Sequence, residues 1–216
     1  MDVKIVAIPC DSVADAARFE ACLAAVSLRS RERILSLKNE DDRRRRLCAA
    51  VALDACLQTV GLREARVKIG EGEHGKPFLT EHPDVHFSVS HSGDWAVCAL
   101  DGEPVGIDIE RVRDKCFAAL AARYFTSEEH AWLVSQADEK RAFFRLWTAK
   151  ESVLKARGTG LSGGLSVPVL CGDALSSPPW RLKEYALPDH ALTVCGRGAF
   201  PEEITVISSC DSVLLR

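Results

Sequence analysis

The stretch Trp147–Gly158 constrains the fold most, because its composition predicts a helix with charged residues along one face. It reads W-T-A-K-E-S-V-L-K-A-R-G, so it is rich in helix formers and contains no proline. Gly158 is well suited to end this helix. Helical spacing places Trp147, Glu151 and Lys155 on one face. The Glu151–Lys155 pair is either a solvent-exposed ion pair or part of a site, and the helix alone does not distinguish the two.

Length and composition indicate an ordinary globular protein of one large domain or two small lobes. The chain has 216 residues, of which 47% are apolar and 27% charged. A net charge of −3 gives no electrostatic case for a nucleic-acid partner. The chain shows neither a secretion signal nor an apolar run long enough to span a membrane. Its nine cysteines form no C-x-x-C pair, which predicts reduced thiols in a cytoplasmic protein.

The first half of the chain alternates apolar and strongly basic segments. Val3–Ile8 predicts a buried strand, and Asp11 or Ser12 begins a predicted helix that runs to about Val26. A second helix is predicted over Arg43–Val60, with two acids before its first turn. The basic segment is either the solvated start of this helix or an anion site. It contains Arg29, Arg31, Arg33, Lys38 and Arg43–Arg46.

Extended segments follow the second helix. Glu71–Leu79 is predicted as a loop that enters an extended segment, and His86–Ser90 and Trp95–Leu100 as two strands joined by a turn. Ser90 and His91 lie where the first strand meets the turn. Their side chains either hold the turn together or donate hydrogen bonds to a phosphate.

A polar break at Asp101–Pro104 is the best candidate boundary between two lobes. The segment V-G-I-D-I-E that follows predicts a strand with Asp108 and Glu110 on one face, roughly 6.5–7 Å apart along the backbone. Carboxylates that share a site repel each other unless a cation lies between them. Oxygen ligands of this kind suit Mg²⁺ or Mn²⁺ rather than zinc. The alternative is a strand end with solvated acids.

The second half combines helices with short strands. Thr126 or Ser127 caps a predicted helix to about Leu133, and Arg141–Arg157 forms the long helix. Gly158–Pro168 is predicted to be a flexible loop. The strands predicted after it are Trp180–Tyr185, Ala191–Cys195 and Ile204–Ser208. A weak echo of Asp94–Leu100 in Asp189–Gly196 hints at two related α+β lobes.

Two motifs together resemble the paired signature of the 4′-phosphopantetheinyl transferases: G-I-D-I-E and, about 40 residues later, W-x-x-K-E-x-x-x-K. The segments G-K-P, F-S-V-S-H-S-G and A-F-P-E-E-I-T are similar to the surfactin-synthetase-activating (Sfp-like) branch. The resemblance covers nearly the whole chain. It implies a pseudo-twofold pair of similar α+β lobes, residues 1–103 and 104–216, with coenzyme A in the cleft between them. It places the metal-binding acids in the second lobe.

The resemblance also implies residue roles. It assigns Mg²⁺, with Mn²⁺ as an alternative, to Asp108, Glu110 and Glu151, and the diphosphate of coenzyme A to Lys155. Two lysines expected in the basic segment are replaced by Ser30 and Arg33, with Arg31 adjacent, so these arginines are predicted to bind the 3′-phosphate. Arg46 stands where a small hydroxyl residue is common, and Ala49 near an expected glycine. The residues assigned to coenzyme A are Arg31, Arg33, Arg45, Lys76, Ser90, His91, Asp108 and Lys155.

The reaction implied transfers the phosphopantetheine arm of coenzyme A to a serine of an apo acyl or peptidyl carrier protein. Glu151 is the first choice for the base that takes the serine proton, and Lys155 stabilises charge on the phosphates. Trp147 is expected to anchor the helix in the core. Lys150 is interpreted as either a phosphate contact or a surface charge.

A monomer is expected, with the carrier docked near residues 158–189, where Leu161 and Leu165 would suit an apolar carrier helix. Two other hypotheses remain open: a non-catalytic protein that binds coenzyme A or a carrier, and a Mg²⁺-dependent nucleotide hydrolase. The carrier's pathway, which is fatty-acid, polyketide or non-ribosomal-peptide synthesis, also remains open.

Overall fold

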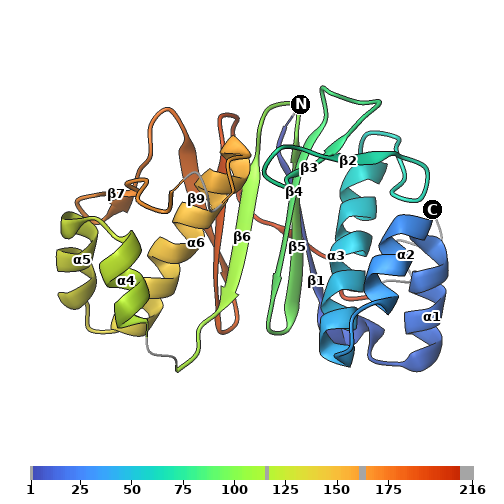
Figure 1. The fold of residues 1–216 in the computed structure, drawn as a ribbon, viewed down its shortest axis with the longest axis horizontal. Coiled ribbons are helices and arrows are strands. Elements are labelled where there is room, and N and C mark those ends of the chain that lie inside the picture. The colour runs from blue at the N-terminus through green and yellow to red at the C-terminus, as the bar shows by residue number, and fades with distance from the viewer. Residues whose placement is uncertain (1, 115–116, 161–163, 210–216) are drawn as a thin grey trace.

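Two β-sheets stand next to each other between two groups of helices, which gives four layers (Figure 1). The computed structural model describes residues 2–114, 117–160 and 164–209. One sheet has the strand order β11-β1-β5-β4, and the other has the order β6-β10-β9. Helices α1 to α3 cover the outer face of the first sheet, and α4 to α6 cover that of the second. The predicted α+β class is confirmed.

Helices of the N-terminal half begin at side-chain caps. Asp15, Ser27 and Asn39 each accept a hydrogen bond from the backbone N–H three residues further on. Helix α3 therefore starts at Glu40, earlier than predicted, and the sequence did not reveal α2. The elements of this half are β1 (Lys4–Pro9), η1 (Cys10–Val13), α1 (Ala16–Ala25), α2 (Leu28–Leu35), α3 (Glu40–Gln58), β2 (Ile69–Glu71), β3 (Pro77–Leu79), β4 (His86–Ser92) and β5 (Trp95–Asp101).

The C-terminal half begins with strand β6. Thr126 and Glu129 form the capping box expected at the start of α5, and Gly158, with φ of 72°, ends α6 as predicted. The elements of this half are β6 (Gly106–Arg111), α4 (Ala118–Tyr124), α5 (Ser127–Val134), α6 (Glu139–Arg157), β7 (Leu170–Cys171), β8 (Ala174–Leu175), β9 (Arg181–Leu187), β10 (His190–Gly196) and β11 (Thr205–Val206). Short hairpins are formed by β2 with β3 and by β7 with β8.

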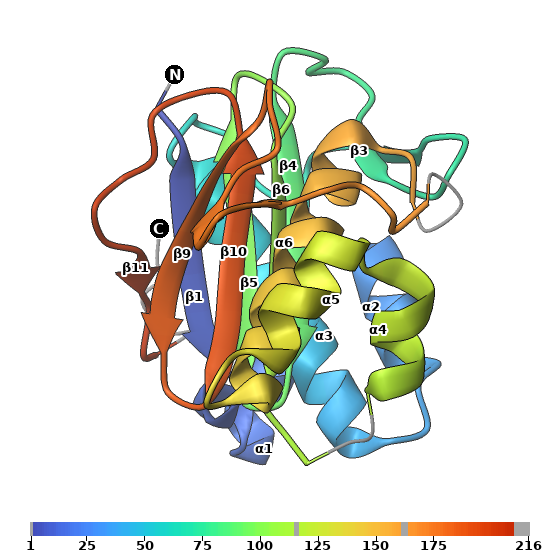
Figure 2. The ribbon, with the colours of Figure 1, turned by 90° about the vertical axis from the view of Figure 1, so that its left-hand side faces the viewer.

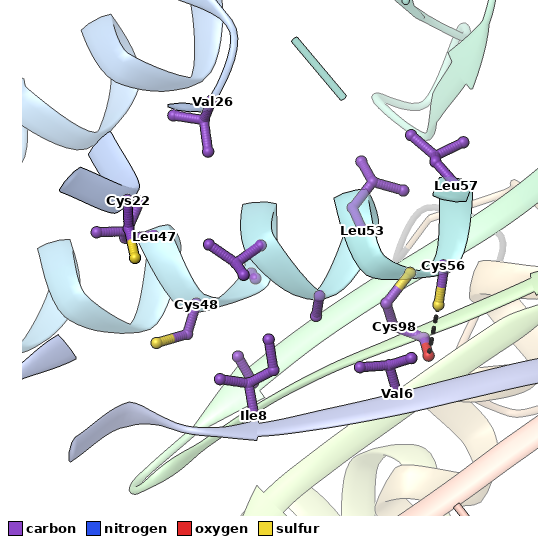
Figure 3. Close-up of a cluster of buried hydrophobic side chains, with 14 of the residues drawn as sticks. Val6, Ile8, Cys22, Val26, Leu47, Cys48, Leu53, Cys56, Leu57 and Cys98 are labelled. Carbon is purple, nitrogen blue, oxygen red and sulfur yellow. Dashed lines mark hydrogen bonds between the residues drawn. The ribbon is translucent and has the colours of Figure 1, made fainter. Parts of the chain in front are cut away.

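Strand β1 serves two cores because its side chains alternate between its faces. Val6 and Ile8 pack toward α3 in the cluster shown in Figure 3. Ile5 and Ala7 pack on the opposite face, against residues of β6 and β10. The inner faces of the two sheets therefore share one apolar core, and each outer face has a separate helical cover. This packing explains why Val3–Ile8 is almost continuously apolar in sequence.

The C-terminal segment joins the two sheets. Strand β11 lies parallel to β1, with Val6 opposite Thr205, and the N–H of Ile207 donates to Ala7 O at 2.9 Å (Figure 2). Between β10 and β11, Pro201 O accepts hydrogen bonds from the side chains of Lys183 and Tyr185 on β9. The segment after the second sheet therefore contributes an edge strand to the first.

Among the described helices, none combines the length and the apolar character that crossing a bilayer requires. The seven described cysteines are thiols, six of them buried and Cys171 exposed. Buried thiols of this kind pack as small apolar side chains, as Cys48 and Cys56 do on α3 (Figure 3).

Candidate active site

The two sheets meet where β4 runs beside β6, and serine hydroxyls bridge them. Every second residue of β4 is a serine whose Oγ accepts a hydrogen bond from a backbone N–H of β6. The pairs are Ser88 with Ile107 at 3.1 Å, Ser90 with Ile109 at 3.4 Å and Ser92 with Arg111 at 3.1 Å. Side chains thus take the place of backbone carbonyls between the two strands. We call this row of contacts the serine seam.

Carboxylates of β6 face the serine seam. Ser90 Oγ donates to Asp108 Oδ1 at 2.8 Å, and Ser92 Oγ donates to Glu110 Oε2 at 2.8 Å. The side chain of Asp108 is buried, whereas Glu110 is partly exposed. The two acids lie on one strand face as predicted, and the hydroxyls of β4 hold them.

Gly106 lets helix α6 approach β6 backbone to backbone. A Cβ atom at this position would lie 2.0 Å from Ser152 O and 2.5 Å from Ala156 N. No side chain fits there. Glu151 and Lys155 directly precede the two contact residues Ser152 and Ala156, so the glycine of G-I-D-I-E explains how α6 reaches the acids of β6.

Lys155 makes the direct link between α6 and β6. Its Nζ lies 2.6 Å from Asp108 Oδ1 and also donates to Ile107 O at 3.1 Å. Burial, the charge of Asp108 and, less strongly, the charge of Glu110 together raise the pKa of Glu151 to about 7, while Lys155 opposes the shift. The structure therefore brings Asp108, Glu110, Glu151 and Lys155 into one electrostatic environment, as the sequence predicted.

The donor atoms fit a hard divalent cation. Asp108 Oδ2 is a buried carboxylate oxygen with no hydrogen-bond partner, although Oδ1 of the same group has two. Burial is the main cause that raises the pKa values of Glu110 and Glu151, and the neighbouring charge of Asp108 adds to it, so a cation bound here would favour the ionised carboxylates. Within the described part of the chain, no three His, Cys, Asp or Glu side chains already converge in the geometry of a metal centre. The ligand chemistry is thus present, and a cation would have to draw the three carboxylates together.

His91, which follows Ser90 on β4, has several cationic side chains near it. Burial first, and then the charges of Arg46, Lys155 and Arg45, together lower the pKa of His91 to about 4. The imidazole is therefore neutral at neutral pH and lies in a positive field. Arg45 itself donates to Gly93 O at 3.4 Å and pairs with Asp42 at 2.6 Å.

Lys76 lies at the C-terminal end of α6. Its Nζ donates to Ala156 O and Val105 O, both at 3.2 Å, and burial lowers the pKa of Lys76 to about 8. Cations are stabilised by the free carbonyls at a helix C-terminus. The G-K-P lysine thus comes from the β2–β3 hairpin and contacts the second sheet and its helix.

The structure separates two arginines that the sequence places together. Arg33 and Arg29 both pair with Glu71, and with Arg46 they line a pocket of about 100 Å³ beside Phe87. The side chain of Arg31 instead turns to the end of α1, where it donates to Leu23 O at 3.1 Å and to Ala24 O at 2.9 Å. Residues two positions apart on a helix point in nearly opposite directions. Ser30 is bound to the buried Glu64.

Lys150, one residue before Glu151, has a role that sequence reasoning missed. It is fully buried, its Nζ lies 2.7 Å from Glu129 Oε2, and it donates to Val167 O at 2.6 Å. The interpretation of Lys150 as a surface charge is therefore wrong. Glu129 in turn accepts from the Val169 N–H at 2.8 Å, so the pair fastens the segment after the Gly158–Pro168 loop to α5 and α6.

Two further residues that the sequence singled out, Trp147 and Leu165, belong to apolar clusters. Trp147 packs in an aromatic cluster with Phe143 and Tyr124, which supports its predicted anchoring role. Leu165 is 2% exposed and belongs to the core, while Leu161 lies outside the described residues. A groove of about 580 Å³ lies between the start of α6 and the strands β9 and β10, and it contains none of the predicted site residues.

Sequence models of known protein families match both halves of the chain. Residues 104–195 match a sequence model described as the 4′-phosphopantetheinyl transferase superfamily, and residues 14–103 match one described as 4′-phosphopantetheinyl transferase, N-terminal. The chain therefore belongs to the 4′-phosphopantetheinyl transferase family. It is an enzyme that transfers the phosphopantetheinyl group.

Individual relatives agree with this family. The 4′-phosphopantetheinyl transferase Sfp of Bacillus subtilis (strain 168) is 31% identical, over 88% of this chain and 90% of its own length. A second Bacillus subtilis 4′-phosphopantetheinyl transferase, ffp, is 30% identical over 95% of this chain and 98% of its own. The predicted Sfp-like branch is confirmed. The crystal structure of Thermotoga maritima holo-[acyl-carrier-protein] synthase aligns with 43% of this chain and 61% of its own, at 19% identity and a TM-score of 0.36, too low to support an argument.

Proposed function

We propose that the protein transfers the 4′-phosphopantetheine arm of coenzyme A to a serine of an apo carrier protein and releases adenosine 3′,5′-bisphosphate. The contact of Lys155 with Asp108, across the junction of α6 and β6, carries this proposal. Phosphoryl transfer requires positioned cations and acids more than covalent chemistry. The junction supplies both kinds of group within one partly buried environment.

Asp108, Glu110 and Glu151 are the residues that we propose hold Mg²⁺, or Mn²⁺ in its place. When bound, the ion would act as a Lewis acid and orient the diphosphate. The unpartnered Asp108 Oδ2 supports this assignment. Lys155 is already fixed beside Asp108 and is placed to bind a phosphate oxygen as charge develops on it.

The remaining anionic groups of coenzyme A would meet cations from the first half of the chain. We propose that Lys76, Arg45 and His91 lie along the diphosphate and nucleotide, since each lies beside the junction of the two sheets. The hydroxyl proton of Ser90 is directed to Asp108, so a bond from Ser90 to a phosphate requires that hydroxyl to rotate. A bound phosphate would also raise the pKa of His91, which burial and the neighbouring cations hold at about 4.

For the 3′-phosphate we revise the residue set. Arg33, Arg29 and Arg46 line one pocket, whereas Arg31 faces α1. We therefore propose that Arg33 and Arg46 bind the 3′-phosphate. Glu71 keeps the guanidinium groups of Arg29 and Arg33 in place until the phosphate arrives.

Glu151 is our proposed base. Without a cation the pKa of Glu151 is raised to about 7, and a bound cation would lower it and favour the ionised carboxylate, which is the form that accepts a proton. Lys155, one turn further along α6, keeps the pKa from rising beyond this range. Loss of the carboxylate should therefore lower the rate even where the fold is intact.

The proposal also covers the two lobes, the oligomeric state, the cellular location and the carrier-docking surface. We propose two lobes, residues 1–103 and 104–216, a monomeric cytoplasmic enzyme, and carrier docking near residues 158–189. The buried Lys150–Glu129 pair supports the docking site, because it gives the loop after α6 a fixed end at Val167–Val169. Leu165 is excluded from the docking surface, since it is buried. An assay with several apo carriers identifies the carrier protein that is modified.

The test is to incubate the protein with coenzyme A, Mg²⁺ and a panel of apo carriers of all three pathways, and to measure intact carrier masses. We expect one phosphopantetheinyl group on at least one carrier, and no transfer by Asp108→Ala. Absence of transfer to every carrier would overturn the proposal and favour a non-catalytic binding protein. Release of adenosine 3′,5′-bisphosphate without any carrier would favour a hydrolase.

A further inference from the structure

The serine seam has a regular pattern that the reaction described so far leaves unexplained. Every second residue of β6 faces the serine seam, and these residues are Gly106, Asp108 and Glu110. Of the three, only the two acids have a side chain. Ser90 and Ser92 each donate to the carboxylate opposite, whereas Ser88 faces a position that has no side chain. All three hydroxyls accept from β6 N–H groups, so the contacts of Ser90 and Ser92 with carboxylates are additional to joining the sheets.

Ser92 is held from two directions. Its Oγ accepts from the N–H of Arg111 at 3.1 Å, and its backbone carbonyl oxygen lies 3.0 Å from His190 Nε2 on β10. His190 is 1% exposed, and its Nδ1 lies 2.6 Å from Pro188 O, so the ring is fixed as well. Strands β4, β6 and β10 thus meet at Ser92.

The hydroxyl proton of Ser92 has one direction left. Because the Arg111 N–H occupies a lone pair of Oγ, the proton points to Glu110 Oε2 at 2.8 Å. This bond orients the Glu110 carboxylate through its Oε2 atom.

We propose that Ser92 is a positioning residue, which holds the Glu110 carboxylate in the orientation in which it binds the divalent cation. This inference rests on the proposed function, because it takes Glu110 as a ligand. Groups that hydrogen-bond a metal ligand typically change metal affinity or activity about 10- to 100-fold when they are removed. Ser92 meets that description, and Ser88 does not.

Ser88 provides the matched control. Ser88→Ala removes one acceptor from the serine seam in the same way as Ser92→Ala, but it changes no contact with a carboxylate. Ser92→Thr keeps a hydroxyl on the strand and serves as the conservative variant. Thermal unfolding of all three variants measures what each loses as a structural element.

The test measures Mn²⁺ binding to the full-length protein by electron paramagnetic resonance, with coenzyme A present, and the Mg²⁺ concentration for half-maximal transfer. We expect Ser92→Ala to weaken Mn²⁺ binding and to raise that Mg²⁺ concentration by about 10- to 100-fold. The KM for coenzyme A should stay within about twofold at saturating metal. Ser92→Thr should recover most of the affinity, and Ser88→Ala should bind Mn²⁺ like the wild type.

Equal Mn²⁺ affinity in Ser92→Ala and the wild type would overturn the inference, and so would an equal loss in Ser88→Ala. The binding readout also separates this inference from the proposed reaction. If the wild type binds Mn²⁺ but modifies no carrier, the proposed function fails. A specific loss of Mn²⁺ binding in Ser92→Ala would still establish Ser92 as the residue that positions Glu110.

Discussion

Helices α3 and α6 occupy corresponding places in the two halves, yet their sheets hold them differently. Both have 19 residues, and each covers the outer face of its own sheet (Figure 1). Helix α3 packs through small side chains, such as Cys48, Ala49 and Ala52. Helix α6 meets β6 backbone to backbone at Gly106.

That difference determines which helix can hold reacting groups rigidly. A layer of side chains separates α3 from its sheet, whereas the backbone contact at Gly106 sets the distance between α6 and β6 directly. The groups that need accurate placement, Glu151 and Lys155, are on α6. Helix α3 contributes Arg45 and Arg46 from its first turns, and long flexible side chains can adjust to a phosphate. Each prediction below tests one side of this contrast.

The largest effect is expected at the buried ion pair of α6. Lys150→Met would leave Glu129 charged and unpaired in the core, which typically costs about 3–5 kcal/mol. Urea unfolding of the purified variant measures this loss. The double variant Lys150→Met with Glu129→Gln should recover part of it, because no buried charge remains. A loss below about 1 kcal/mol in the single variant would show that Glu129 is readily solvated or protonated.

Gly106→Ala tests the backbone contact directly. Overpacking of this kind costs about 1–3 kcal/mol in stability, and a shift of α6 by about 1 Å can reduce the rate about 100-fold. Carrier modification rates measured beside thermal unfolding separate the two effects. Gly196→Ala is the control, since its added Cβ would make only ordinary contacts at 3.4 Å or more. A Gly106→Ala enzyme of normal rate would contradict the close-approach argument.

In the first half of the chain, Arg33→Ala on α2 and Arg46→Ala on α3 should each weaken the binding of coenzyme A about tenfold, or by about 1.4 kcal/mol. Dephospho-coenzyme A should be affected much less, because it lacks the 3′-phosphate. Calorimetric titration with both ligands measures the two losses. Arg31→Ala is the matched control from the same basic helix, since its guanidinium faces α1. If Arg31→Ala discriminated between the ligands as Arg33→Ala does, the revised assignment would be wrong.

The smallest effect concerns pH. The pKa of Glu151 is raised to about 7 in the folded state, so its contribution to stability falls as pH rises from about 4.5 through 7. With a metal chelator present, Glu151→Gln should be more stable than the wild type at pH 8, by up to about 1 kcal/mol, and the difference should vanish near pH 5. Thermal unfolding at pH 5–8 checks this. Added Mg²⁺ should reverse the order at pH 8, because only the wild type keeps all three carboxylates.

Local patterns predicted which acids share a strand face and which charged residues share a helix face, and the family resemblance placed the two faces in one site. Strand alternation placed Asp108 and Glu110 on one face, and helical spacing placed Glu151 and Lys155 on another; both predictions agree with the structure. The N-terminal basic segment was harder. Its own pattern did not reveal α2, so Arg31 and Arg33 were grouped although they point in opposite directions.

Contacts between distant segments account for what was missed. The burial of Lys150 could not be predicted, because its partner Glu129 lies on another helix, where the local pattern indicates only an acid in the first turn. The serine seam was missed because its serines and the N–H groups they bind are 19 residues apart and belong to different sheets.

The sequence carries the periodicities of individual strands and helices, the residue types of the site, and the family. Periodicity depends on backbone geometry within one element, and it can be recognised without knowing what that element packs against. The fold alone establishes that Gly106 admits α6, that Arg31 leaves the site, and that Ser92 holds Glu110. Each of these facts depends on the distance between elements, and that distance arises only when the two sheets pack.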